Sequence, residues 1–161
     1  MMESPAASGG SASGRQVTDM ATRPQAAGSH RRDNAGSALT IGKILSAVLL
    51  LAMGGIHLYL VFDGVGGVLG VLFVLNAIGG LVLAIAMLVL RGGLLTLATV
   101  LSLLFMVGTL LALVLALTVG LFGITESLDF TLVPTTLVVE SLGTIVLAVT
   151  TAMLLSGRRA A

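Results

Sequence analysis

Residues 67–90 read GVLGVLFVLNAIGGLVLAIAMLVL, a stretch of the chain that carries no formal charge. A helix of this length reaches about 36 Å, and the hydrocarbon core of a bilayer is about 30 Å thick. A glycine-rich segment with Asp63 precedes the stretch, and Arg91-Gly92-Gly93 follows it. The pattern predicts a transmembrane helix between two short turns.

Three more apolar runs lie around this stretch. A polar loop with Glu126 and Asp129 separates the last two runs. Loops this short make consecutive helices antiparallel neighbours. The sequence therefore predicts an all-α polytopic membrane protein, an antiparallel bundle of four transmembrane helices in one domain, 39–155. The four predicted helices are 39–62, 67–90, 94–122 and 132–155.

Composition supports a membrane protein. Of the 161 residues, 57% are apolar and 9% are charged, against about 25% charged in soluble domains. The absence of cysteine excludes disulfides and cysteine-ligated metals within the chain. The net charge of +1 gives a nucleic acid nothing to bind. The lipid bilayer is the expected partner.

Residues 1–38 are rich in glycine, serine and alanine and predict a disordered tail, while 156–161 form a short basic tail. A cleaved signal peptide is the alternative for the N-terminal part. Its apolar core would span about 7–15 residues, and the run 39–62 is longer. Arg31-Arg32 suggest a twin-arginine signal, but Asp33 follows them where such signals become apolar.

The basic residues predict the orientation. All of them lie in the tails, at the adjoining helix ends or in the second loop, whereas the charged residues of the first and third loops are all acidic. The positive-inside rule then places both termini in the cytoplasm and the helices in the cytoplasmic membrane. The basic residues are Arg15, Arg23, Arg31, Arg32, Lys43, Arg91, Arg158 and Arg159.

Small residues at four-residue spacing predict where helices pack, because close backbone approach is a main source of helix association in lipid. The third helix carries such a stripe without a break, the second carries a shorter one, and the fourth carries Thr136 and Thr144 on either side of Glu140. The predicted packing residues are Gly108, Ala112, Ala116 and Gly120 on the third helix, and Gly80 and Ala84 on the second.

Glu140 is the carboxyl expected inside the membrane, about 12 Å from the outer end of its helix by the standard rise. A charge at such depth costs about 2.5–3.5 kcal/mol on insertion scales, so it normally faces inward and finds a partner. His57 and Asn76 lie about 8 Å and 14 Å deep by the same rise. Either these three side chains line an outer-leaflet site for a proton, an ion or a small molecule, or His57 and Asn76 only satisfy Glu140 structurally. The sequence leaves its ionisation open.

Few residues are candidates for a metal site, a haem site or a catalytic nucleophile. His30 lies in the tail, so a metal or haem on His57 would need Met53, Glu140 or a second subunit. Ser141 lies about 100° around the helix from Glu140 and makes no nucleophile–base pair. Glu126 is an acid of the external loop that is most simply solvated, with a contribution to the site as the alternative. We expect no metal, no cofactor and no enzymatic activity.

Short motifs, Gly55-Ile56-His57-Leu58-Tyr59-Leu60, then Leu72-Phe73-Val74-Leu75-Asn76-Ala77, then Gly120-Leu121-Phe122-Gly123, together with Glu126 and Glu140, carry a resemblance. Over residues 42–155 the chain resembles the uncharacterised four-span integral membrane proteins of actinobacteria. Its general layout is similar to DoxX-like proteins in architecture alone. The resemblance implies a bacterial protein with polar positions at His57, Asn76, Glu126 and Glu140, and it implies no activity.

Two functions remain open at this stage. The first is an accessory or interaction subunit with a membrane-protein partner. The alternative is a protein that binds or transports a proton, an ion or a small molecule through His57, Asn76 and Glu140. Four helices make a thin wall for a transport path, so this alternative predicts a homo-oligomer.

Overall fold

The computed structural model describes residues 15–120 and 132–159. Within these ranges the chain is helical, without strands, which confirms the predicted all-α fold with four long helices. The helices are α1 (Arg15–Phe62), α2 (Gly67–Val89), α3 (Gly92–Thr118) and α4 (Val133–Arg159).

The chain divides into two units, Met1–Ser37 and Ala38–Ala161. The α1 helix begins at Arg15, so the described part of the N-terminal unit is helical upstream of the apolar run. Extending an existing helix adds one hydrogen bond per residue without a new nucleation step. Residues 1–14 lie outside the described part, and the assignment of residues 1–38 to a disordered tail stays a prediction.

Each helix contains a segment long and apolar enough to cross a membrane. Large apolar side chains such as Leu75, Ile78 and Leu104 are exposed on the helix surfaces. In water such a surface would be unfavourable, whereas in lipid it faces acyl chains. By length and composition the chain is therefore a multi-pass membrane protein. The four spans are Gly36–Phe62, Gly67–Val89, Gly92–Thr118 and Val133–Arg158.

Glycines occupy the tight turns between consecutive helices. Gly64 adopts a φ of 108° between α1 and α2, and Gly92 adopts a φ of 58° where α3 begins; both angles favour a residue without Cβ. The α3 helix ends at Thr118, short of the predicted Phe122, because the amides of Val119 and Gly120 both donate to the Leu115 carbonyl. This pattern closes a helix C-terminus.

The core of the bundle lies between all four helices. A Cβ on Gly80 of α2 would lie 2.9 Å from the Leu50 carbonyl oxygen of α1, and one on Gly143 of α4 would lie 2.6 Å from Met106 Cε of α3. These close approaches are the contacts that small residues permit. The cluster of buried apolar side chains comprises Ala47, Leu50 and Met53 of α1, Ala84 and Met87 of α2, Leu95 and Met106 of α3, and Leu147 of α4.

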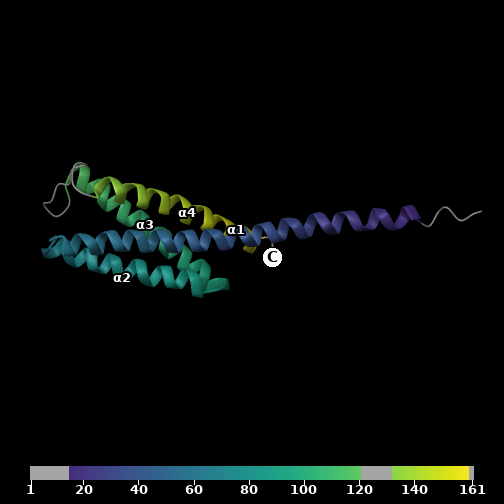
Figure 1. The fold of residues 1–161 in the computed structure, drawn as a ribbon, viewed down its shortest axis with the longest axis horizontal. Helices are drawn as coiled ribbons and strands as arrows, with labels where there is room; N and C mark the ends of the chain where they lie inside the picture. Colours follow the sequence, from purple (N-terminus) through teal and green to yellow (C-terminus); the bar gives the residue numbers. More distant parts are fainter. Residues whose placement is uncertain (1–14, 121–131, 160–161) are drawn as a thin grey trace, which may run out of the picture. The chain divides into compact units, whose positions relative to one another are not determined.

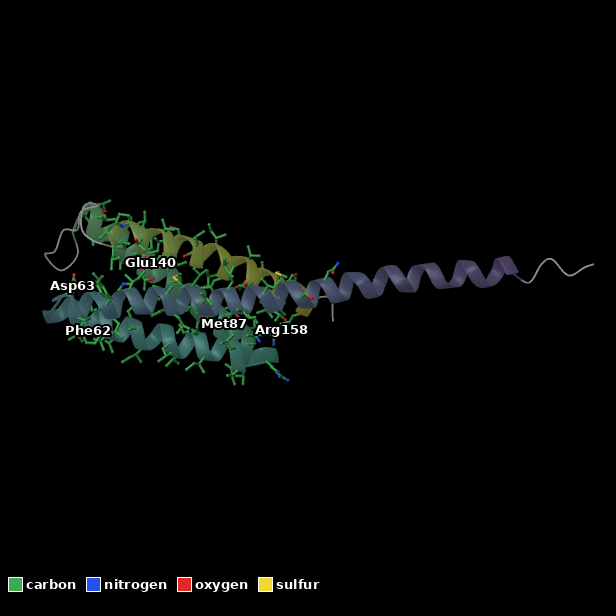
Figure 2. All side chains as sticks on the ribbon, viewed as in Figure 1. Phe62, Asp63, Met87, Glu140 and Arg158 are labelled. Carbon is green, nitrogen blue, oxygen red and sulfur yellow. The ribbon has the colours of Figure 1, made fainter. Side chains whose placement is uncertain are left out.

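The two ends of the bundle differ. Asp63 and Phe62 lie at one end, called here the Asp63 end, and Arg158 lies at the other, the Arg91 end (Figure 2). From the Arg91 end α3 starts beside α2 and then runs along α4, so that α1 and α2 diverge from α3 and α4 towards the Asp63 end (Figure 1). At Gly79 of α2 an added Cβ would lie 2.9 Å from the Phe105 ring of α3, so the two helices are still close there. The divergence leaves room between the helix pairs at the Asp63 end.

Candidate functional site

A cavity of about 680 Å³ fills the space between the diverging helices at the Asp63 end. Its volume lies within the range of about 300–1,000 Å³ that is usual for small-molecule sites. The described lining residues are largely apolar, with four polar side chains among them and no acid, lysine or arginine. The polar lining residues are His57 of α1, Asn76 of α2, Thr109 of α3 and Thr136 of α4.

His57 is held rigidly in the wall of this cavity. Its side chain is buried, and its Nδ1 lies 2.9 Å from the Met53 carbonyl oxygen one turn earlier. A carbonyl oxygen can only accept, so this contact places a proton on Nδ1. The ring also meets the Phe73 ring edge to face, with centroids 4.8 Å apart. In the neutral ring, Nε2 is left as a hydrogen-bond acceptor.

Asn76 contributes an unpartnered acceptor from α2. Its Oδ1 is buried and has no hydrogen-bond partner among the described residues. An unpartnered buried polar atom costs about 1–3 kcal/mol. A ligand that donates a hydrogen bond to Oδ1 would recover part of that cost.

Glu140 lies fully buried on α4, and neither of its carboxyl oxygens forms a hydrogen bond with a described residue. Thr109 of α3 lies beside this carboxyl. The Thr109 hydroxyl donates to the Met106 carbonyl oxygen at 2.9 Å, so its proton is not available to Glu140. The carboxyl is therefore enclosed in the bundle beside Thr109, which lines the cavity, whereas Glu140 does not.

Thr136 repeats the hydrogen-bonding arrangement of Thr109. Its hydroxyl donates to the Leu132 carbonyl oxygen at 2.8 Å. Threonine hydroxyls commonly bond backwards to the carbonyl one turn earlier, and this uses their single proton. Thr109 and Thr136 consequently present oxygen lone pairs to the cavity.

The cavity reaches the lipid-facing surface between α2 and α3. Leu75 and Leu104 both line it, and they are 58% and 62% exposed. Gly108 also lines it, and a Cβ there would meet nothing within 4 Å. By length and composition this surface faces lipid, so the opening between α2 and α3 is directed to the bilayer.

The structure separates the three predicted polar residues into two groups. His57 and Asn76 line one cavity, as the shared depth suggested, whereas Glu140 lies beside Thr109 and does not line it. Neither His57 nor Asn76 forms a hydrogen bond with the carboxyl, so the interpretation that they satisfy Glu140 finds no support in the described contacts. Glu126 lies outside the described residues.

The predicted packing residues also divide. Gly80 and Ala84 are buried against the neighbouring helices. On α3, Ala112 and Ala116 line the cavity, and Gly108 does not make the close helix contact that the stripe predicts. The reason is that α3 has diverged from α2 at this level, so small residues widen the cavity instead of closing a helix pair. Gly120 follows the end of α3 and is half-buried.

Sequence reasoning missed Thr109 as a site residue and took Thr136 only as part of a stripe. The position of Thr136 one turn before Glu140 was a usable signal, whereas Thr109 becomes relevant only when the register of α3 against α4 is known. Among the side chains that the structure describes, no group of three or more histidine, aspartate or glutamate residues is placed to hold a metal ion.

The fold and the cavity define a class, a four-helix multi-pass membrane protein with a partly open cavity between its helices. Comparisons with models of protein families, with curated proteins and with solved structures give no match. The resemblance to the actinobacterial four-span proteins therefore stays a prediction.

Proposed function

We propose that this protein binds a hydrophobic small molecule that enters its cavity from the bilayer. The observation that carries the proposal is the cavity of about 680 Å³, with apolar walls and a few placed polar groups, which is the usual build of a small-molecule site. The homo-oligomer expected for a transport path stays a prediction.

The test compares wild-type protein with a variant whose cavity is filled. Gly108→Leu places a side chain at a lining position that has open space around it. Gly55→Leu is the matched control, because Gly55 is also an exposed helical glycine with nothing within 4 Å, and it does not line the cavity. Native mass spectrometry of protein in nanodiscs titrated with 1-dodecanol measures stoichiometric binding.

We expect one bound dodecanol on the wild type and on Gly55→Leu, and none on Gly108→Leu. Equal binding to all three proteins would show that the alcohol sits in the surrounding lipid, and the proposal would fail. The role as an accessory or interaction subunit stays a prediction, since no described feature outside the lipid-facing surface indicates a protein partner.

We also propose the cytoplasmic membrane of a bacterium, with both termini in the cytoplasm. Arg91 and Arg158 belong to one end of the bundle and Asp63 to the other, which supports this orientation by the positive-inside rule. The chain contains no cysteine, so a thiol reagent labels only the single cysteine that is introduced. Gly66→Cys and Gly157→Cys suit the test, because both glycines are exposed and have free space. A membrane-impermeant thiol reagent added to intact cells should label only Gly66→Cys, and labelling of only Gly157→Cys would reverse the orientation.

A further inference from the structure

The hydrogen bonds of the cavity wall use up its hydroxyl and imidazole protons. They leave hydrogen-bond acceptors available to a ligand. Thr109 and Thr136 have donated their protons to backbone carbonyls. His57 directs its Nδ1 proton to Met53. The unpartnered atom of Asn76 is the oxygen Oδ1. The side chains of the wall thus offer mainly acceptors.

The Glu140 carboxyl reinforces this pattern. It lies beside Thr109, and neither of its oxygens has a hydrogen-bond partner among the described residues. No arginine or lysine occurs among the described lining residues. A cation in the cavity would favour the ionised form of the Glu140 carboxyl, and the low dielectric of the site strengthens the attraction between the two.

We propose that the ligand is a lipophilic primary amine, bound as its ammonium form with the alkyl chain directed to the α2–α3 opening. This inference rests on the proposed function and names its ligand class. A primary ammonium carries three N–H donors, and the cavity wall offers acceptors on His57, Asn76, Thr109 and Thr136. The Glu140 carboxyl beside Thr109 would supply the balancing charge. The exposed Leu75 and Leu104 at the opening accommodate the chain.

Other lipophilic ligands differ from a primary amine in their hydrogen-bond donors or in their charge. Four probes of equal chain length therefore separate these ligand classes. Dodecylamine carries charge and donors, 1-dodecanol carries one donor, dodecyltrimethylammonium carries charge without donors, and dodecanoate carries the opposite charge. Each is titrated at pH 7 into wild-type protein in nanodiscs of phosphatidylcholine. The Gly108→Leu variant provides the subtraction for partition into lipid.

We expect dodecylamine to bind at least about tenfold more tightly than dodecyltrimethylammonium, because hydrogen bonds to a charged group are the stronger ones. Dodecanoate should show no saturable binding. If no probe binds in the cavity, the proposed function itself fails. If dodecyltrimethylammonium or dodecanoate binds as tightly as dodecylamine, the cavity remains a binding site and the ligand class proposed here is wrong.

Variants assign the acceptors and the charge. Glu140→Gln should weaken dodecylamine by about tenfold and leave 1-dodecanol unchanged. Asp63→Asn removes the same charge at the exposed turn and should change neither. A loss of both ligands in Glu140→Gln would show a structural role for the carboxyl and overturn its part in the proposal.

Thr136→Val keeps the argument testable if Glu140→Gln fails to fold. Thr144→Val is its control, because the Thr144 hydroxyl likewise donates one turn back, to the Glu140 carbonyl oxygen at 2.8 Å, and does not line the cavity. We expect Thr136→Val to weaken dodecylamine several-fold and Thr144→Val to leave it unchanged. Equal effects of the two substitutions would contradict the proposed contact.

Discussion

One added methyl group, in Gly80→Ala, tests the close approach of α1 and α2 through its effect on the free energy of unfolding. A Cβ at Gly80 would lie 2.9 Å from the Leu50 carbonyl oxygen, about 0.5 Å inside the 3.4 Å at which ordinary contact begins. The obstacle is backbone, so Gly80→Ala must push the two helices apart. Overpacking of this kind costs about 1–3 kcal/mol.

Alanine also changes helix propensity, and Gly108→Ala provides the correction. Both positions are helical glycines, so each substitution gains about 0.5–1 kcal/mol from the helix itself. At Gly108 the new Cβ meets nothing within 4 Å. The difference between the two variants therefore isolates the packing cost at Gly80, which we expect at about 1–3 kcal/mol.

The assay is equilibrium unfolding of purified protein in mixed micelles of dodecylmaltoside and sodium dodecyl sulfate, followed by far-UV circular dichroism. Gly108→Ala should equal or exceed the wild-type free energy of unfolding, and Gly80→Ala should fall below Gly108→Ala by the packing cost. Variants that agree within about 0.5 kcal/mol, the usual effect of a substitution away from any special feature, would refute the close α1–α2 contact.

Three further predictions use the same assay. Gly143→Ala should cost less than Gly80→Ala, because the Cβ would meet the flexible end of Met106; an equal cost would contradict this explanation. Thr99→Val removes the hydroxyl whose single proton is shared between the Leu95 carbonyl oxygen and the Met87 sulfur and should cost about 0.6 kcal/mol, the mean for interhelical hydrogen bonds in membranes; a gain in stability would contradict this contact. Glu140→Met should raise the free energy of unfolding by about 1–3 kcal/mol, since it removes an unpartnered buried carboxyl; a loss of stability would reveal a partner for that carboxyl.

The fold was largely predictable because lipid imposes one requirement on every residue it meets. A backbone in hydrocarbon must satisfy its own hydrogen bonds, so an uncharged run such as residues 67–90 is a helix. The glycines beside Asp63 and Arg91 indicated the turns between antiparallel helices. The exact end of α3 was not predictable, because residues 119–122 are apolar and the end depends on the backbone conformation at Gly120, with a φ of 82°.

The site was predictable only in part, because residue type and depth do not determine the direction in which a side chain points from its helix. His57 and Asn76 could be selected as polar residues in apolar helices, and the structure places both in one cavity. The place of Glu140 beside Thr109 depends on the angle of α4 about its own axis, which the sequence does not determine. The divergence of α3 from α2 likewise turned Gly108 from an expected packing residue into part of a cavity wall.

The unpartnered acceptors connect stability with function. Glu140 and Asn76 Oδ1 are buried without hydrogen-bond partners among the described residues, and each makes the bundle less stable than an apolar residue would. Because Thr109 and Thr136 have already used their protons on backbone carbonyls, no rotation of those hydroxyls satisfies these acceptors without breaking another bond. In the proposed complex, a donor from the ligand satisfies the Asn76 oxygen at no such cost, whereas Glu140 lies outside the cavity lining. The ligand class proposed above thus brings the N–H groups that the wall threonines have already committed to backbone carbonyls.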